Sequence, residues 1–277
     1  MGDRILIFSL ARCGSETLVS ILNSHPEIRC VSEPFNSDNF EGQYRKRVQD
    51  AKSLYEAMDD LYKQYTAIKH VWDASGWPFS KMPQFNPLLL QAPHQKIIFL
   101  TRKNSLKRVV SLCIAGQTKR WGVFSDEDRA SLAAFAFSPI QPQFVGWHLD
   151  GEKKLVPEYR KLLHDCKCEF MDLSYEQLFD PSHTSAQRTE TITQIMAFLG
   201  KSGLQNAETQ ERMVGFLRTR QTAVDASLLY DRIPNIQEIE KQFGSPETGT
   251  LFGTSRMDSG ATGKVLPSPA NCAITTT

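Results

Sequence analysis

Five short apolar runs are spread along the chain of 277 residues, each bounded by polar or turn-forming residues. The run at residues 5–8 is rich in β-branched and aromatic residues and is too short to form a helix, so it predicts a buried strand, and the other four runs also predict strands. The predicted strands occupy residues 5–8, 28–32, 66–71, 96–101 and 168–173.

Segments with helical periodicity separate these runs. In residues 17–23, for example, Leu18, Ile21 and Leu22 fall on one face of a helix. The other predicted helices cover residues 47–65, a segment that Ser105 caps, 147–165 with a break near Pro157, 185–199 and 207–218. This alternation predicts an α/β fold, with a P-loop-like parallel sheet of about five strands and helices on both faces.

The domain organisation follows from where these elements end. One α/β domain is predicted over residues 1–245, and residues 246–277, rich in Gly, Ser, Thr and Pro, predict a C-terminal loop and tail. Residues 79–95 contain three prolines and predict an irregular excursion suited to a substrate lid.

The turn between the first strand and the first helix has the composition of an anion-binding loop. The first amides of a helix lack internal partners and carry partial positive charge, and glycine lets a ligand approach the backbone. A guanidinium and hydroxyl groups add donors for phosphate or sulfate. The residues concerned are Arg12, Cys13, Gly14, Ser15, Glu16 and Thr17. The alternative is an ordinary turn in which Ser15 caps the helix.

This turn differs from the standard P-loop of nucleoside triphosphatases, which has a lysine directly before its last hydroxyl residue. No lysine is present between Ser9 and Ser20. A Mg²⁺-dependent triphosphate site is therefore not favoured.

Composition and charge narrow the class of protein. The net charge is +1 without a long block of Lys or Arg, so no nucleic-acid partner is indicated. No membrane span and no signal peptide are recognisable. The six cysteines form no paired C-x-x-C motif, so neither a disulfide framework nor a metal site is indicated. We expect a cytoplasmic protein with no membrane partner, and its number of subunits stays open.

Ionisable side chains follow three of the predicted strands near their carboxyl ends, where open α/β sheets bind ligands. They are Glu33, His70 and Arg102. Arg102 also precedes a helix start, where a phosphate can meet both the guanidinium and backbone amides. The plain alternatives are a solvated carboxylate and a packed histidine.

Four separated segments together resemble the sulfotransferases that use 3′-phosphoadenosine 5′-phosphosulfate (PAPS) and release 3′-phosphoadenosine 5′-phosphate (PAP). They are residues 12–17, Glu33-Pro34-Phe35, the strand ending at Arg102 with Ser111 after it, and residues 174–181 with Tyr175. The interval from Arg102 to Ser111 looks most like that of the bacterial trehalose-type, carbohydrate-sulfating members. The resemblance spans about two thirds of the chain.

The resemblance implies a role for each of these segments. Residues 12–17 would bind the 5′-phosphosulfate, Arg102 and Ser111 the 3′-phosphate, and Tyr175 the adenine. Either Glu33 or His70 would be the catalytic base, with Glu33 the better motif match, and Arg12 would stabilise the leaving phosphate. No metal is required.

Two residues of the loop depart from the family pattern. Cys13 replaces the common serine, and Glu16 stands where the family usually has Ser or Thr. A carboxylate beside bound phosphate is unfavourable unless it points away or pairs with a cation.

The sequence indicates sulfuryl transfer from PAPS to a hydroxyl or amine of a small acceptor, such as a sugar or a specialised metabolite. The alternatives are an ATP-dependent phosphotransferase on a related fold and a catalytically degenerate nucleotide-binding protein. Aromatic residues in segments 35–45, 72–95 and 117–147 are candidates for the acceptor lining, which suits a planar or sugar acceptor.

Overall fold

A computed structural model describes residues 4–121, 126–201, 207–222 and 227–252. Five parallel strands form one sheet in the order β2-β3-β1-β4-β5. The strands are β1 (Ile5–Leu10), β2 (Cys30–Ser32), β3 (Ala67–Trp72), β4 (Lys96–Thr101) and β5 (Glu169–Ser174). The five predicted strands are confirmed, with small shifts at their ends.

The central strand β1 is buried along its whole length, because β3 and β4 flank it and helices cover both faces. Successive side chains of a strand point to opposite faces, so the register sorts them into two groups. Phe8 pairs with His70 and Phe99 across the sheet, and these three rings lie on one face. Ile7 pairs with Lys69, so Lys69 points to the opposite face.

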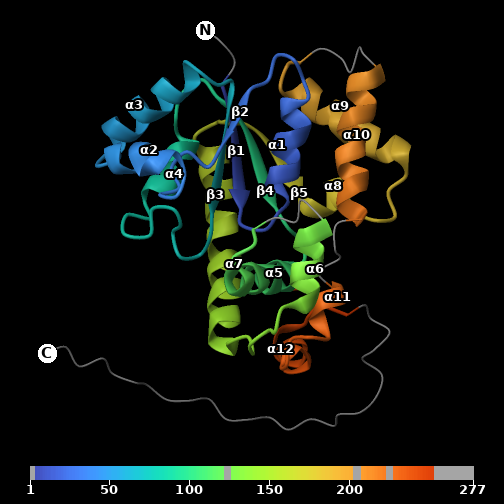
Figure 1. The fold of residues 1–277 in the computed structure, drawn as a ribbon. Helices are drawn as coiled ribbons and strands as arrows, with labels where there is room; N and C mark the ends of the chain where they lie inside the picture. The colour runs from blue at the N-terminus through green and yellow to red at the C-terminus, as the bar shows by residue number, and fades with distance from the viewer. Residues whose placement is uncertain (1–3, 122–125, 202–206, 223–226, 253–277) are drawn as a thin grey trace, which may run out of the picture.

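Helices lie on both sides of the sheet, as predicted (Figure 1). One side carries α1 (Ser15–Asn23), α8 (Tyr175–Phe179), α9 (Ser185–Phe198) and α10 (Ala207–Thr222). The other carries α2 (Gln43–Arg47), α3 (Ala51–Tyr62), α4 (Phe85–Leu90) and most of α7 (Pro142–Asp165). A short 3-10 helix, η1 (Phe40–Gly42), precedes α2.

A second group of helices lies beyond the carboxyl ends of the strands (Figure 1). It contains α5 (Ser105–Thr118), α6 (Asp126–Ala134), α11 (Ser227–Tyr230), α12 (Ile236–Phe243) and the start of α7. Residues of α5, α11, α12 and the start of α7 form a hydrophobic cluster of their own, separate from the core around the sheet. The carboxyl edge of the sheet therefore lies between two packed units.

Three local expectations were wrong. Asn104, not Ser105, caps α5, because the Asn104 side chain accepts a hydrogen bond from the Lys107 amide. Helix α7 runs on through Pro157, since Val156 and Tyr159 on either side are buried in the core. Residues 79–95 contain α4, and Phe79, Phe85 and Leu89 are buried, so this segment is packed core and not an irregular lid.

The first residues of the predicted tail pack against the second group of helices. The Leu251 amide donates to Glu240 on α12, and Asn104 donates to the Thr250 carbonyl. Residues 253–277, the rest of the predicted tail, lie outside the described residues. Within the described ranges, no helix combines the length and apolarity needed to cross a bilayer.

Candidate donor site at the carboxyl edge of the sheet

The turn after β1 brings the backbone of residues 11–14 around the start of α1. Arg12 and Gly14 both adopt left-handed conformations, with φ of 67° and 83°. Gly14 is the N-cap of α1 and has no side chain to cap it, while Ser15 is the first helical residue and is buried. The alternative of a turn capped by Ser15 is therefore wrong, and the start of α1 has the geometry of an anion site.

Arg12 and Ser111, which lie 99 residues apart in the sequence, are in direct contact. The Arg12 Nε donates a hydrogen bond of 3.1 Å to the Ser111 hydroxyl, and its Nη1 donates to the carbonyl oxygen of Trp121. The sequence assigned Arg12 and Ser111 to different phosphates of one donor. Their contact places the two proposed phosphate subsites next to each other.

Arg102 and Tyr175 form a second pair at the same edge. The Arg102 guanidinium carbon lies 4.2 Å from the centre of the Tyr175 ring, a cation–π contact. The Arg102 Nε is buried and has no hydrogen-bond partner among the described residues. Arginine and tyrosine in this arrangement offer a cation and an aromatic face side by side.

The two backbone amides that follow Arg102 already have hydrogen-bond partners, so they are not free to bind a phosphate. Glu176, next to Tyr175, accepts hydrogen bonds from the amides of Lys103 and Asn104 at 2.9 and 3.1 Å. The expectation that a phosphate meets these amides together with the guanidinium is therefore wrong. The Arg102 guanidinium, which packs on Tyr175, is the group near these two amides that could bind an anion.

A buried ion pair lies beneath the loop. Arg108 of α5 is fully buried and donates from Nε to Glu152 of α7 at 2.7 Å. Its Nη1 donates to the carbonyl of Ala11 at 3.5 Å. Sequence reasoning missed this pair, because arginine and glutamate in amphipathic helices read as solvated. It ties the loop to the second group of helices.

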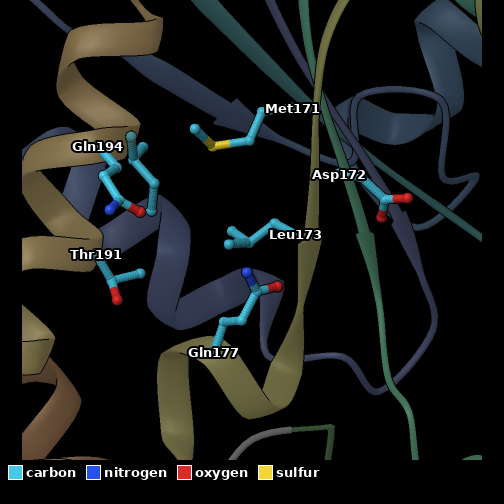
Figure 2. Close-up of a pocket in the computed structure, with 7 residues that line it drawn as sticks. Met171, Asp172, Leu173, Gln177, Thr191 and Gln194 are labelled. Atoms are coloured by element: carbon cyan, nitrogen blue, oxygen red, sulfur yellow. The ribbon is translucent and has the colours of Figure 1, made fainter.

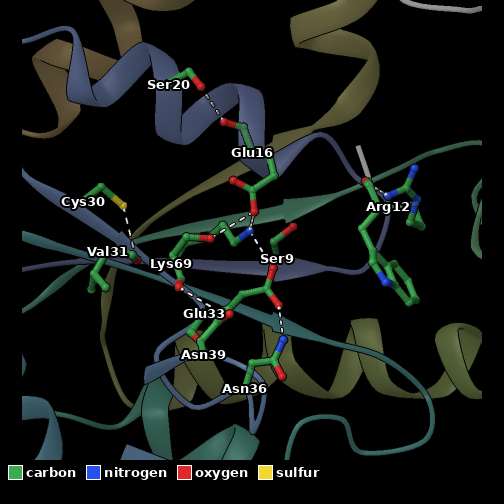
Figure 3. Close-up of polar contacts among 12 residues, drawn as sticks. Ser9, Arg12, Glu16, Ser20, Cys30, Val31, Glu33, Asn36, Asn39 and Lys69 are labelled. Carbon is green, nitrogen blue, oxygen red and sulfur yellow. Dashed lines mark hydrogen bonds and ion pairs between the residues drawn. The ribbon is translucent and has the colours of Figure 1, made fainter. Parts of the chain in front are cut away.

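A second ion cluster, which we call the lysine bridge, consists of Glu16, Lys69 and Glu33 (Figure 3). The Lys69 side chain is 1% exposed, and its Nζ contacts a carboxylate oxygen of Glu16 and, at 2.7 Å, Oε1 of Glu33. Ser32 also donates to Glu16 at 3.0 Å. Glu16 is therefore paired with a cation, one of the two arrangements in which a carboxylate can lie beside bound phosphate.

Glu33 is held in place by backbone as well as side-chain contacts. Its φ of 48° is left-handed, a conformation that non-glycine residues adopt mainly at constrained sites. Its amide donates to the Lys69 carbonyl, and its own carbonyl accepts from Asn39. The second carboxylate oxygen accepts a long bond of 3.4 Å from Asn36. The Glu33 side chain is 22% exposed, so most of it is buried.

His70 lies in a different environment from Glu33. It points to the other face of the sheet, is 1% exposed, and stacks between Phe8 and Phe79. Its Nε2 contacts the Asn86 side-chain oxygen at 2.8 Å. Burial among these rings lowers the pKa of His70 from 6.5 to about 4, although the Asn86 bond opposes the shift.

Cys13 is fully enclosed in the core. Burial raises the pKa of its thiol to about 12, so the side chain is a neutral thiol. Cys13 therefore contributes its backbone, and not its side chain, to the surface of the loop. Thr17, at the other end of the loop, donates its amide to the Gly14 carbonyl.

Lys69 lies at the carboxyl end of a predicted strand, but the sequence alone did not select it as a site residue. The signal was a lysine within an otherwise apolar and aromatic strand, Ala67 to Trp72, that follows two segments carrying Glu16 and Glu33. Recognising the cluster required the register between β2, β3 and β1, which the sequence does not show. Elsewhere in the described chain, no three His, Cys, Asp or Glu side chains are grouped to hold a metal ion.

Of the aromatic residues expected to line the acceptor site, several belong to the core. Trp72, Phe79 and Phe85 are buried, whereas Trp121 and Trp147 are 57% and 51% exposed. Phe124 lies outside the described residues.

A hollow of about 220 Å³ lies apart from the donor site, at the outer edge of the sheet (Figure 2). Side chains of β5, α8 and α9 line it, with Leu173, Gln177 and Thr191 among them. It contains none of the predicted site residues.

Comparison with known proteins identifies relatives. No protein-family model matches the chain. Nodulation protein H of Rhizobium tropici is 29% identical over 178 residues, covering 58% of this chain and 70% of that protein. Nodulation protein H of Rhizobium meliloti strain 1021 is 25% identical over 210 residues, covering 68% of this chain and 85% of that protein. A further Rhizobium meliloti sequence of the same name is 23% identical over 251 residues, 89% of this chain and 93% of that protein.

Two solved structures resemble the fold in outline. Mouse sulfotransferase SULT7A1 complexed with PAP matches with a TM-score of 0.40 and 14% identity, over 77% of this chain and 63% of that one. Shikimate kinase from Acinetobacter baumannii in complex with shikimate matches with a TM-score of 0.37 and 12% identity, over 73% of this chain and 96% of that one. These scores are too low to carry an argument about function.

The four sequence segments that resemble sulfotransferases end at one edge of an α/β sheet, where Arg12 meets Ser111 and Arg102 meets Tyr175. The chain is also similar, over 68% and 89% of its length, to two proteins named Nodulation protein H.

Proposed function

We propose that this protein transfers the sulfuryl group of PAPS to a hydroxyl or amine of a small acceptor and releases PAP. The proposal includes a sugar or specialised metabolite as the acceptor and the cytoplasm as the place of action. The donor would bind along the carboxyl edge of the sheet, with its reactive end at the start of α1.

One observation supports the proposal: side chains far apart in the sequence form two pairs at the carboxyl edge of the sheet, Arg12 with Ser111 and Arg102 with Tyr175. The anion site at the start of α1, with Arg12, suits the 5′-phosphosulfate. Ser111 and Arg102 supply a hydroxyl and a guanidinium for the 3′-phosphate, and the Tyr175 ring supplies a stacking face for adenine.

The chemistry follows from this arrangement. The acceptor oxygen or nitrogen attacks sulfur in line with the bond to the 5′-phosphate oxygen. A bond from sulfur to the acceptor forms, the bond to the phosphate oxygen breaks, and the acceptor proton passes to a base. Arg12 and the α1 amides stabilise the charge that develops on the leaving phosphate.

We assign the base to Glu33. Within the described part of the chain, its Oε2 accepts only the long hydrogen bond from Asn36, so that oxygen can take a proton from a bound acceptor. His70 points to the opposite face of the sheet, where aromatic rings enclose it and its Nε2 is hydrogen-bonded to Asn86. The environment of each residue therefore favours Glu33.

The two alternatives are less well supported. A phosphotransferase would need the lysine that the loop lacks. The degenerate nucleotide-binding protein was motivated by Glu16 in the anion loop, and Lys69 neutralises that carboxylate.

Ligand-induced stabilisation separates these functions. PAP is expected to raise the melting temperature of the purified protein, because it binds only the folded state. ATP with Mg²⁺ and ADP are the comparison ligands. Stabilisation by Mg²⁺-ATP without any response to PAP would overturn the proposal. Incubation of PAPS with host extract, followed by mass spectrometry for an SO₃ gain, then identifies the acceptor.

Substitution of the proposed base tests the mechanism. In Glu33→Gln the proton acceptor is lost, and we expect kcat to fall by about 10²- to 10⁴-fold. The PAP-induced melting shift should persist, because Glu33 is not assigned to donor binding. Asn36→Ala, which removes only the long contact to Oε2, is the control and should retain most of the activity. Equal activity of Glu33→Gln and the native protein would exclude Glu33 as the base.

A further inference from the structure

We propose that Glu16 and Lys69 set the proton affinity of Glu33, so that the lysine bridge tunes the base. This inference rests on the proposed function only in calling Glu33 the base. Lys69 and Glu16 are positioning residues in this scheme, since they act on the reaction through Glu33.

The geometry of the lysine bridge couples the three charges tightly (Figure 3). Glu16 comes from the first turn of α1, Lys69 from β3, and Glu33 from the residue after β2. One ammonium nitrogen contacts a carboxylate oxygen of each glutamate. With charge-assisted bonds of about 2.7–2.9 Å, the two carboxylates are held within about 6 Å of each other.

The charge balance is what makes the arrangement useful. A buried lysine paired with one carboxylate would hold that carboxylate in its charged form and make it a poor base. Here two carboxylates share one ammonium, so the cluster carries one excess negative charge. The second carboxylate, Glu16, competes for Lys69 and opposes its effect on Glu33. Proton transfer from the acceptor to Glu33 brings the cluster to neutrality.

The other titratable groups near Lys69 do not add to the net negative charge of the lysine bridge. The Cys30 thiol on β2 interacts with Lys69, but burial raises its pKa to about 12, so it is neutral. His70 points to the opposite face and is also neutral at pH 7, because burial lowers its pKa to about 4. Ser32 and Asn36 contribute only neutral hydrogen-bond donors to the two carboxylates. Glu16, Lys69 and Glu33 therefore hold the full charges of the cluster.

The two neighbours act in opposite directions, which gives a test that a purely structural role would not pass. Removing the negative charge in Glu16→Gln favours the ionised form of Glu33 and should move its titration midpoint down. Removing the positive charge in Lys69→Met, which keeps side-chain length and volume, should move the midpoint up. Because one ammonium nitrogen contacts both carboxylates, each substitution changes a charge close to Glu33.

The midpoint is measured directly by ¹³C NMR of the full-length protein carrying ¹³Cδ-labelled glutamate. The Glu33 resonance is assigned as the one that Glu33→Gln lacks. The control variant is Glu27→Gln, because Glu27 also pairs with a buried lysine, Lys201, at 3.0 Å but is not part of the cluster. It should leave the Glu33 midpoint unchanged.

Opposite shifts in Glu16→Gln and Lys69→Met support the proposal. Unchanged midpoints, or shifts in the same direction, overturn it. Should Lys69→Met fail to fold, Glu16→Gln decides alone, because the Glu16 side chain is 47% exposed and its loss leaves the core intact. A Glu16→Gln midpoint that does not fall then overturns the proposal.

The pH dependence of kcat/KM connects this result to the activity. Its acid limb should move with the NMR midpoint, down in Glu16→Gln and up in Lys69→Met, with PAPS as the donor. A protein that neither binds PAP nor transfers sulfuryl would refute the proposed function while the NMR shifts still stand. Transfer by a protein whose midpoints do not respond would refute this inference alone.

Discussion

Gly14 is the residue on which the shape of the donor loop depends. Its φ of 83° is left-handed, and a Cβ at this position would lie 2.4 Å from the Phe179 ring of α8. An alanine would therefore force both the loop and Phe179 to move. We expect Gly14→Ala to lower the free energy of unfolding by about 1–3 kcal/mol. Urea denaturation measures this loss, and PAP binding should weaken as the loop shifts.

A second glycine provides the matched control for this substitution. Gly116 lies inside α5, and a Cβ there would meet nothing within 4 Å. Because alanine is the better helix former, Gly116→Ala should leave stability unchanged or raise it by up to about 1 kcal/mol. Similar losses in both variants would contradict the special role assigned to Gly14.

In the proposed site, we expect Arg102 to bind the 3′-phosphate. Loss of its charged hydrogen bonds in Arg102→Ala should weaken PAP binding by about 1.5–3 kcal/mol, which is about tenfold to a hundredfold. Adenosine 5′-phosphosulfate lacks the 3′-phosphate, so it should bind the variant and the native protein equally. Calorimetric titration with both ligands measures the difference.

Arg102→Lys gives a finer control, because it keeps the charge but loses the planar contact with Tyr175. It should fall between the native protein and Arg102→Ala in PAP affinity. Equal losses for PAP and adenosine 5′-phosphosulfate in Arg102→Ala would show that Arg102 is structural.

At the scale of elements, Asn104 joins the start of α5 to the segment after α12. Its side-chain oxygen caps α5 through the Lys107 amide, and its nitrogen donates to the Thr250 carbonyl at 2.9 Å. Asn104→Ala should destabilise the fold by about 0.5–2 kcal/mol through the lost cap. Asn104→Ser can still cap the helix but is too short to reach Thr250. In thermal denaturation the serine variant should recover most of the cap contribution.

The same element shows where prediction from the sequence succeeds and fails. The five strands were predictable, because runs such as Ile97 to Leu100 are apolar and short, with polar residues after them. The α5 cap was misplaced by one residue, since Asn104 and Ser105 both suit a cap and the choice depends on the contact with Thr250. Helix α7 continues through Pro157 because burial of its neighbours outweighs the lost backbone bond.

At the scale of the whole molecule, the sequence predicts which residues follow the strands at one edge of the sheet, but not the contacts among them. Parallel strands end at one edge, so Glu33 and Arg102 could be placed there together. Register and side-chain direction decide the rest. Lys69 and His70 are adjacent in sequence, yet one joins the lysine bridge and the other enters the aromatic core. The sequence does not distinguish these two faces of β3, because both residues are polar.

The buried histidines make the stability of the whole molecule depend on pH. His70 and His148 are 1% and 2% exposed, and burial lowers the pKa of each from 6.5 to about 4. The unfolded chain therefore binds protons between pH 6.5 and pH 4 that the folded chain does not. The stability that comes from keeping these rings neutral is fully present above pH 6.5 and is lost as the pH falls towards 4.

Replacing His70 isolates one part of this dependence. Between pH 7 and pH 5, His70 alone should account for about 2 kcal/mol of lost stability. His70→Gln keeps a donor for the Asn86 oxygen but does not titrate, so its free energy of unfolding should fall by about 2 kcal/mol less over this range. The variant also loses ring stacking against Phe8 and Phe79, so its stability at pH 7 should be lower. The measured quantity is therefore the slope with pH, obtained from urea denaturation at several pH values.

His94→Asn, which replaces an exposed histidine, should keep the native slope. A native slope in His70→Gln as well would mean that the acid sensitivity comes from other groups.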